Sequence, residues 1–440
     1  MSTLSRPNRR TVLATGAAAL ALTQGVRAQS TLEASEFGVT ANSGTDQTGA
    51  MQQALDQAGI SGETLLLPAG EIQVSDLTFP AIIALQGSGA GSALTTAAGG
   101  RAGVISAANS ASFNNIIFGG SSGGTLGGAI MEVNGSDGVS FERCQFTAGS
   151  TGLTIYDSAV TITNCVFGDH DDAAIHSNNS RGLTITGNRI AVCGNAGIRI
   201  WRDAPGPDGS IVTANHIATV DWRAGGSGEN GNGINIFRAD GVIIANNHIS
   251  KCAFSAIRLN TTRNSQVSGN ICMNSGECAI FSEFAFSGSM IANNIVDTAA
   301  SGISITNLDQ DGHLAVCSGN LVRNITPGSQ TNPDTIPVGI YAEADTAVTG
   351  NTVDNVPGLA IGAGYGSYLR NVLISSNVVT NADYGIGVSV VQGCGPVQVA
   401  NNLVASRKAD LVGLEWTKVV STDLAADAGK YPHVTVSGNS

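Results

Sequence analysis

Short segments that alternate between apolar and polar positions recur along most of the chain. In one phrase, an apolar residue stands three positions before an asparagine, and another usually stands two positions after it. This phrase occurs at residues 183–190, 242–249, 265–272, 289–296, 346–353, 372–379, 397–404 and 434–440. Earlier copies carry Cys144 and Cys165 in place of the asparagine. Alternation of this kind predicts short β-strands separated by turns.

A second phrase alternates with the first and reads small residue, isoleucine or leucine, any residue, apolar residue. Its key apolar residues are Ile130, Leu153, Ile175, Ile198, Ile234, Ile257, Ile280, Ile303, Ile340, Ile361 and Ile386. Most successive members are about 23 residues apart. A unit of this size with two short strands cannot close a core alone, so the units must stack on their neighbours. The pattern therefore predicts an all-β parallel β-helix, and chirality favours the right-handed form.

The repeated asparagine is expected at a turn. Asparagine tolerates left-handed backbone angles, and stacked amides can form hydrogen bonds from coil to coil.

Two intervals of the repeat are longer than the rest because extra residues enter them. The extra residues lie at 201–210, 219–233, 307–313 and 323–337 and are rich in Gly, Pro, Asn and Asp. Such composition predicts loops, and long insertions on a solenoid often cluster at its binding face. Neutral growth of surface loops explains them equally well.

Residues 29–95 differ from the repeats, and we expect them to form an N-terminal cap and the first coils of one domain spanning 29–440. The apolar residues Ala50, Met51, Ala54, Leu55 and Ala58 follow helical spacing. A helix here would cover the open strand edge at the end of the solenoid.

Composition agrees with a β-rich fold, because only 12% of residues are charged and 57 are glycines. The formal net charge of −12 argues against a nucleic-acid partner. Arg9 and Arg10 precede an Ala/Leu-rich run that ends in a small-residue cleavage site after Ala28. Residues 1–28 are therefore expected to be a twin-arginine signal peptide, with an ordinary signal peptide as the alternative. The run is too short for stable membrane insertion. We expect a periplasmic or secreted protein that meets the twin-arginine export machinery.

Four short motifs near the N-terminus carry a family resemblance. Phe37-Gly38, the helix start at Gly44–Thr48, the turn at Leu67–Gly70 and the phrase at Leu85–Gly89 resemble the opening segment of the pectate lyase-like superfamily. With the signal and the asparagine repeats, nearly the whole chain resembles the twin-arginine-translocated repeat proteins, a bacterial family of unassigned function. The resemblance implies the β-helix and export, and it implies little about activity.

The same superfamily includes polygalacturonases, whose catalytic pattern is mostly missing here. Asp171 and Asp172 precede Ile175 with a one-residue shift, and the neighbouring coils lack the expected acid and histidine. Arg258 matches part of a later motif, but Asn260 replaces its lysine. Hydrolysis would need paired carboxylates at a defined separation.

Stacking turns the repeat into columns of outward-facing side chains. The first column is expected to be Thr154, His176, Arg199, Asn235, Arg258, Phe281, Ser304 and Tyr341. The second is expected to be Tyr156, Asn178, Trp201, Phe237, Asn260, Glu283, Thr306 and Glu343. Arginine binds carboxylates through two hydrogen bonds, and aromatic faces suit sugar rings. We therefore predict a surface patch that binds an acidic polysaccharide. Its members are Arg199, Trp201, Arg202, Asn235, Phe237, Arg238, Arg258, Asn260 and Glu283.

Processing of that polysaccharide by a lyase, epimerase or hydrolase is an open possibility. His176 is the candidate base, with Asp172, Asp169 or Tyr156 as its partner. The alternatives are an ordinary exposed histidine and, for the whole protein, a non-catalytic surface or envelope module that binds glycan or protein.

The segment at 168–176 is the densest cluster of ionisable groups in the chain. Asp169, His170, Asp171 and Asp172 offer ligands for Ca²⁺, but their spacing matches no recognised calcium loop, so a solvated acidic turn is favoured. We expect no required metal or other cofactor. The cysteines at shared turn positions, Cys144 with Cys165 and Cys193 with Cys252, are expected to stack inward as small apolar side chains.

Overall fold

The structure is a computed structural model that describes residues 30–88, 91–96, 100–120, 128–307 and 311–440. The expected signal peptide at residues 1–28 lies outside these residues. Among them, no helix is long and apolar enough to cross a membrane.

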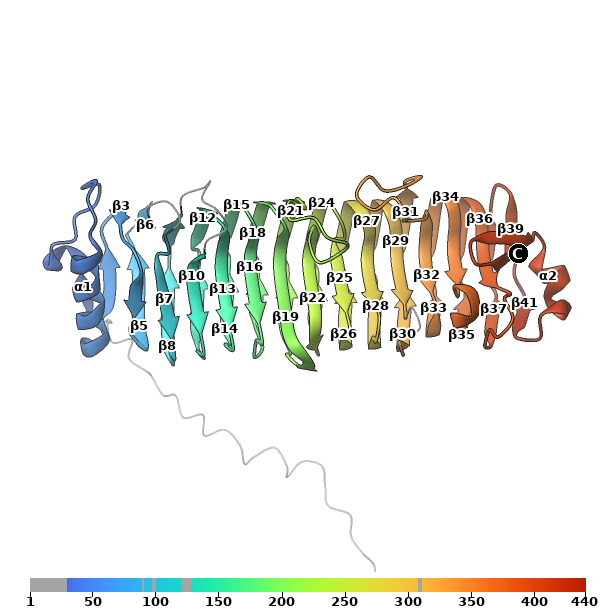
Figure 1. The fold of residues 1–440 in the computed structure, drawn as a ribbon, viewed down its shortest axis with the longest axis horizontal. Helices are drawn as coiled ribbons and strands as arrows, with labels where there is room; N and C mark the ends of the chain where they lie inside the picture. The colour runs from blue at the N-terminus through green and yellow to red at the C-terminus, as the bar shows by residue number, and fades with distance from the viewer. Residues whose placement is uncertain (1–29, 89–90, 97–99, 121–127, 308–310) are drawn as a thin grey trace, which may run out of the picture.

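Most coils of the solenoid contain three strands, and in several coils the second and third strands merge into one long strand, such as β27 (Ile271–Glu283). One coil is formed by β23 (Ile243–Ala245), β24 (His248–Cys252) and β25 (Ile257–Asn260). The first strand of every coil belongs to a 16-stranded sheet, and the remaining strand or strands belong to a 25-stranded sheet. Strands in successive coils pair in parallel, so the coils stack along the long axis of the molecule (Figure 1). The parallel β-helix is confirmed. The expected two strands per unit are found only where the second and third strands merge, and the other coils have three because the asparagine phrase spans a strand, a turn and a second strand.

Asparagines form a continuous ladder inside the solenoid. The side-chain amide of Asn294 donates to Oδ1 of Asn320 in the next coil at 3.0 Å and to the carbonyl of Val267 at 3.0 Å. The same pattern joins Asn188, Asn215, Asn247, Asn270, Asn294, Asn320, Asn351, Asn377, Asn402 and Asn439. The predicted bonding from coil to coil is confirmed.

The left-handed backbone conformation lies one residue earlier than the sequence suggests. Asn293 has φ 58°, and Gly269 and Gly319 hold the equivalent position in neighbouring coils. The role of the ladder asparagines lies in their buried side-chain amides. Each amide forms hydrogen bonds with backbone groups that the turn leaves without partners.

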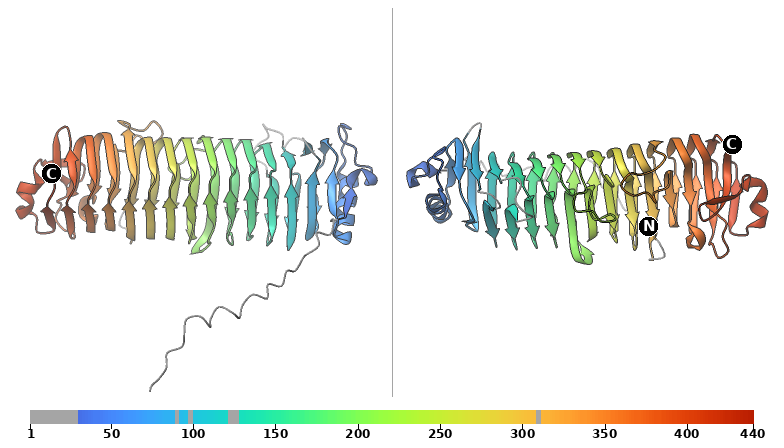
Figure 2. Two further views of the ribbon diagram at one scale, coloured as in Figure 1. Left: turned by 180° about the vertical axis from the view of Figure 1, so that it is seen from behind. Right: turned by 45° about the horizontal axis from the view of Figure 1, so that its top comes forward.

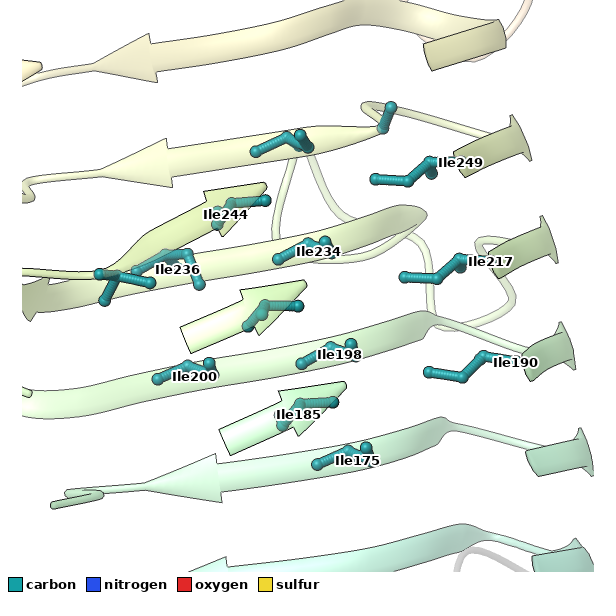
Figure 3. Close-up of a cluster of buried hydrophobic side chains, with 14 of the residues drawn as sticks. Ile175, Ile185, Ile190, Ile198, Ile200, Ile217, Ile234, Ile236, Ile244 and Ile249 are labelled. Atoms are coloured by element: carbon teal, nitrogen blue, oxygen red, sulfur yellow. The ribbon is translucent and has the colours of Figure 1, made fainter. Parts of the chain in front are cut away.

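Equivalent isoleucines from successive coils stack in the core. Ile198 pairs in register with Ile175 on one side and Ile234 on the other, and all three side chains are fully buried (Figure 3). Burial of each such side chain contributes about 1.5–3 kcal/mol. The repeat spacing thus follows from the need to place like residues above one another.

The expected N-terminal helix is present as α1 (Thr48–Ser61), with Met51, Ala54, Leu55 and Ala58 buried. It packs against β2 (Thr64–Leu67), β4 (Leu77–Phe79) and β5 (Ile82–Gly87) at the N-terminal end (Figure 1). The outermost strand of the sheet there is β1 (Thr31–Glu33), so α1 does not cover that edge alone. A second short helix, α2 (Leu424–Asp427), lies near the C-terminus.

Two of the predicted insertions form loops over one face. Loop A, residues 221–231, joins β21 (His216–Val220) to β22 (Asn232–Asp240). Loop B, residues 326–337, joins β31 (Leu321–Ile325) to β32 (Val338–Ala342). Both lie toward the viewer in the right-hand view of Figure 2.

The other two insertions differ from the expectation or are only partly described. Residues 201–207 are not a loop, because β19 runs from Ala196 to Pro207 and its extension pairs with β22. The segment expected at 307–313 joins β29 (Ile295–Thr306) to β30 (His313–Ser318), and residues 308–310 lie outside the described part.

The eight cysteines are free thiols. Cys144 and Cys165 stack inward at the head of the asparagine ladder, where the backbone N–H of Cys165 donates to Oδ1 of Asn188 at 2.8 Å. Cys193 and Cys252 are also buried, with Val220 of the intervening coil between them. The predicted inward stacking is confirmed.

Candidate functional site

The predicted columns are in register. His176 on β16 (Ala173–Asn178) pairs with Arg199 on β19, and Arg199 pairs with Asn235 on β22. The column continues through Arg258 on β25 to Phe281 on β27 (Ile271–Glu283). The second column runs through Asn178, Trp201, Phe237, Asn260, Glu283 and Thr306. The repeat therefore placed these side chains in the correct order on one face.

Loop A buries much of this face, which corrects the expectation that Arg199 lies on the surface. Arg199 is only 4% exposed. Its Nη2 donates to Oδ1 of Asn230 in loop A at 2.6 Å, and Nδ2 of Asn235 donates to the carbonyl of Glu229 at 3.1 Å. The columns thus support a loop as well as facing outward.

Arg199 is also paired with a carboxylate of its own chain. Its Nη1 lies 3.0 and 2.9 Å from the two carboxylate oxygens of Asp172, and Nδ2 of Asn195 donates to Oδ1 of Asp172 at 3.0 Å. The arginine therefore does not present a free fork to a substrate carboxylate.

Arg258 is held in the same way by two glutamates. Its Nε and Nη2 donate to the two carboxylate oxygens of Glu283 at 2.8 and 2.9 Å, and its Nη1 donates to Oε2 of Glu277 at 2.8 Å. Oε1 of Glu277 accepts from Nδ2 of Asn332 in loop B at 2.8 Å. Burial raises the pKa of Glu283, and the adjacent guanidinium of Arg258 opposes that rise. The ion-pair cluster thus joins the column to loop B.

Arg202 and Arg238 lie outside this cluster. Nη1 of Arg202 donates to the carbonyl of Ser180 at 3.1 Å, and Nη1 of Arg238 donates to the carbonyl of Asp203 at 2.7 Å. The Arg238 guanidinium lies 4.5 Å from the centre of the Phe237 ring. They were predicted as substrate-binding residues, but these contacts hold them beside the projecting end of β19.

The predicted catalytic residues do not form one constellation. The ring of His176 packs edge-on against Trp201 at 5.3 Å, and burial together with nearby Arg199 lowers the pKa of His176 to about 4. Asp172 is engaged by Arg199 and Asn195. Tyr156 is 43% exposed and pairs in register with Asn178, and the exposed Asp169 lies on another strand, β15 (Val166–His170). The geometry favours none of these residues as a working base.

The side chains of the acidic segment at 169–172 have separate surroundings and do not converge on one point. His170 points inward and is buried, Asp169 is exposed, Asp171 pairs with Arg223 at 3.2 Å, and Asp172 pairs with Arg199. In the part of the chain that the structure describes, no three His, Cys, Asp or Glu side chains are grouped to hold a metal ion.

Two adjoining pockets lie between the columns and the loops. Pocket 1 has a volume of about 480 Å³. It is lined by Trp201, Ser227, Gly228, Glu229, Asn235, Phe237, Arg258, Asn260, Glu283 and Phe284. Six of the nine predicted binding residues therefore meet here, whereas Arg199, Arg202 and Arg238 do not line it.

Pocket 2 has a volume of about 450 Å³ and shares Ser227, Arg258, Glu283 and Phe284 with pocket 1. Its other walls include Glu277, Thr306 and Glu343, together with Asp334 of loop B. We call the joined pockets the groove. From Trp201 to Thr306 the groove crosses four coil spacings, about 19 Å at roughly 4.8 Å between paired strands.

Several residues of the groove were missed by sequence reasoning. Glu277 precedes the repeated phrase, and Glu229 and Asp334 lie in insertions. The repeat gives no register to residues outside it, so only the Gly- and Asn-rich composition of the insertions signalled that they could cover a site.

Comparison with known proteins supports the fold. The family described as "Right handed beta helix region" matches residues 102–219 and 203–317. The solenoid is thus a right-handed parallel β-helix, as the sequence predicts. No curated protein matches the chain.

Solved structures share this architecture at low sequence identity. The enzymatically active domain of bacteriophage CBA120 tailspike protein 2 is 14% identical, with a TM-score of 0.54 over 66% of this chain and 47% of that one. Bacteriophage CBA120 tailspike protein 3 is 12% identical, with a TM-score of 0.51 over 93% and 61%. The catalytic domain of a GH87 α-1,3-glucanase in complex with nigerose is 13% identical, with a TM-score of 0.47 over 93% and 69%. The chain spans about half to three fifths of the tailspike chains, and the likeness shows the fold alone.

Proposed function

We propose that this right-handed β-helix binds a polysaccharide in the groove beneath loops A and B. The observation that carries the proposal is the meeting of Trp201, Phe237 and Phe284 with Asn235, Asn260 and Glu283 around one pocket of about 480 Å³. Apolar rings with a few convergent polar groups are typical of ligand pockets, and aromatic faces pack against the C–H faces of sugars.

The groove also has the shape that a chain-like ligand needs. It follows the stacking direction, because its walls come from equivalent positions of successive coils. A polymer lying along it would contact side chains from several successive coils.

Binding is supported better than processing. Three buried or half-buried carboxylates next to the groove, those of Asp172, Glu277 and Glu283, are each held by an arginine and an amide. A general acid or base must be able to exchange its proton with the substrate. This arrangement favours the non-catalytic reading over a lyase, epimerase or hydrolase.

The proposal is tested with an array of polysaccharides probed with the wild-type protein and with Trp201→Ala. We expect selective binding by the wild type that the variant loses. The polysaccharides that bind are then assayed for new reducing ends and for ultraviolet-absorbing unsaturated products. Formation of either product would show that the protein is an enzyme. If the wild type bound none of the polysaccharides, the proposal would be wrong.

Export is a second part of the proposal and rests on Arg9, Arg10 and the apolar run before Ala28. Residues 1–28 fused to a reporter should direct it out of the cytoplasm, and replacement of both arginines by lysine should abolish that transport. An unaffected double variant would favour an ordinary signal peptide.

A further inference from the structure

We infer that the polysaccharide bound by the groove carries no acidic groups, and that amino groups on its sugars strengthen binding. The inference rests on the proposed function and names the class of ligand. It departs from the expectation of an acidic polysaccharide, whose premise was a set of free arginines.

The charges that line the groove are the first support. Five of the described lining residues carry carboxylates: Glu229, Glu277, Glu283, Asp334 and Glu343. Among the same residues, only Arg258 carries a positive charge. Because Arg258 is shared by Glu277 and Glu283, it offsets one of these two charges and leaves an excess of negative charge along the groove.

For a polyanion, the free-energy cost of entering such a site would exceed the gain from its contacts. Its acidic groups would leave water and approach carboxylates of the same sign, and like-charge contacts at an interface are strongly unfavourable. Arg258 is a weak partner for it, because three of its five N–H groups already donate to Glu277 and Glu283 and its charge is shared by both carboxylates. An ammonium group on a sugar would instead be attracted by these carboxylates.

Buried polar atoms without partners are the second, independent support. Thr306 lines pocket 2 and is 6% exposed, and its Oγ1 has no hydrogen-bond partner among the residues that the structure describes. Nε1 of Trp201, in the wall of pocket 1, also has none. Buried hydroxyl and indole groups normally have partners, and the hydroxyls of a sugar would supply them.

Two carboxylates can be changed without disturbing the buried cluster. Glu229 in loop A and Asp334 in loop B are exposed, and neither forms an ion pair within the described residues. They line the groove from the two loops, so they contribute to its potential. Oε2 of Glu229 also accepts from the backbone N–H of Ser227 at 3.1 Å, and the amide oxygen of a glutamine can keep that bond.

The experiment compares binding of chitosan, chitin oligomers, β-glucan and polygalacturonate within a wider array, at low and at high salt. We expect the bound members to be uncharged or amino-bearing and the acidic members to be absent. High salt should weaken amino-bearing ligands more than uncharged ones, because it screens the carboxylates. If acidic members are bound in preference, the inference is overturned while the proposed function stands. If nothing binds, the proposed function fails as well.

The variants Glu229→Gln and Asp334→Asn should each weaken an amino-bearing ligand by roughly two- to fivefold, the range expected for an exposed ion pair, and leave uncharged ligands unchanged. Where the array yields only uncharged ligands, the same variants should gain affinity for polygalacturonate. Asp56→Asn on α1, far from the groove, is the matched control and should change neither. Equal effects of all three variants would contradict the inference.

Discussion

Arg258 reaches from one coil to the carboxylate of Glu283 in the next, where Nε and Nη2 donate to its two oxygens at 2.8 and 2.9 Å. The arginine is 8% exposed and the glutamate 2%. A residue pair that the sequence suggested for substrate binding is thus an internal ion pair, with Glu277 as its second acceptor. The side chains that separate the two pockets are held rigid by this arrangement.

Replacement of Arg258 by methionine should be strongly destabilising. It would leave the carboxylates of Glu277 and Glu283 buried without their cation, which typically costs about 3–5 kcal/mol. The free energy of unfolding in urea measures this loss. Arg189→Met, at an exposed position of the same sheet, is the control and should cost less than about 0.5 kcal/mol. Equal losses in the two variants would show that the buried cluster has no special role.

The asparagine ladder predicts a sharp contrast between neighbouring residues. Asn294→Ala removes the amide that serves Asn270, Asn320 and the carbonyl of Val267, and should cost about 1–3 kcal/mol. Asn293→Gly should be neutral or slightly stabilising, because Asn293 is exposed and has φ 58°, where glycine is unstrained. Denaturant unfolding of both variants tests the assignment. If Asn293→Gly lost more unfolding free energy than Asn294→Ala, the assignment of the structural role to Asn294 would be contradicted.

His170 should make the fold sensitive to acid. Burial lowers its pKa from the ordinary 6.5 to about 4, so between these values the unfolded chain binds a proton that the folded chain does not. Stability contributed by neutral His170 is therefore complete above about pH 6.5 and falls by up to about 3 kcal/mol as the pH drops toward 4.

His170→Val should remove that part of the pH dependence. Valine already occupies the equivalent position at Val220. Within the described part of the chain, neither ring nitrogen of His170 forms a hydrogen bond, so this variant should also gain stability at neutral pH. His170→Gln should remove the pH dependence without the gain. Unfolding free energies at about pH 7 and about pH 5 distinguish these outcomes. A wild-type pH dependence retained in both variants would assign the effect to another group.

Asn230 should hold loop A over the groove. Its side chain accepts from Arg199 and donates to the carbonyl of Gly225 at 2.9 Å. Asn230→Ala should open the loop and speed tryptic cleavage after the exposed Arg223, with weaker glycan binding in parallel. Ser227→Ala, in the same loop, is the control. The hydroxyl of Ser227 forms no hydrogen bond with the described residues, so trypsin should cleave this variant at the wild-type rate. Equal cleavage rates in all three proteins would argue against this anchor.

The sequence predicted the order of the groove residues but not their surroundings. The repeated phrase aligned Arg199 with Asn235 and Trp201 with Phe237 across an insertion, because side chains alternate faces along a strand and equivalent positions must stack. It could not reveal that Asn230 covers Arg199 or that Glu277 binds Arg258. Those partners come from an insertion and from a position before the repeated phrase, where no periodicity fixes the side chain.

The same limit applies to the acidic segment at 169–172. Four adjacent ionisable residues at 169–172 look like one cluster, but a strand end with a left-handed residue at Asp169 sends His170 inward and its neighbours elsewhere. Proximity along the chain is a poor guide to proximity in space where the backbone turns.

Trp201 and Phe237 are expected to be the aromatic side chains against which the polysaccharide packs in the groove. Calorimetric titration of a polysaccharide selected on the array tests it most directly, with wild type, Trp201→Ala and Phe237→Ala, and with Tyr156→Ala as the aromatic control outside the pockets. Loss of a central aromatic anchor costs about 2 kcal/mol, so each groove variant should bind roughly 30-fold more weakly while Tyr156→Ala binds like the wild type. Wild-type affinity in both correctly folded groove variants would contradict the claim.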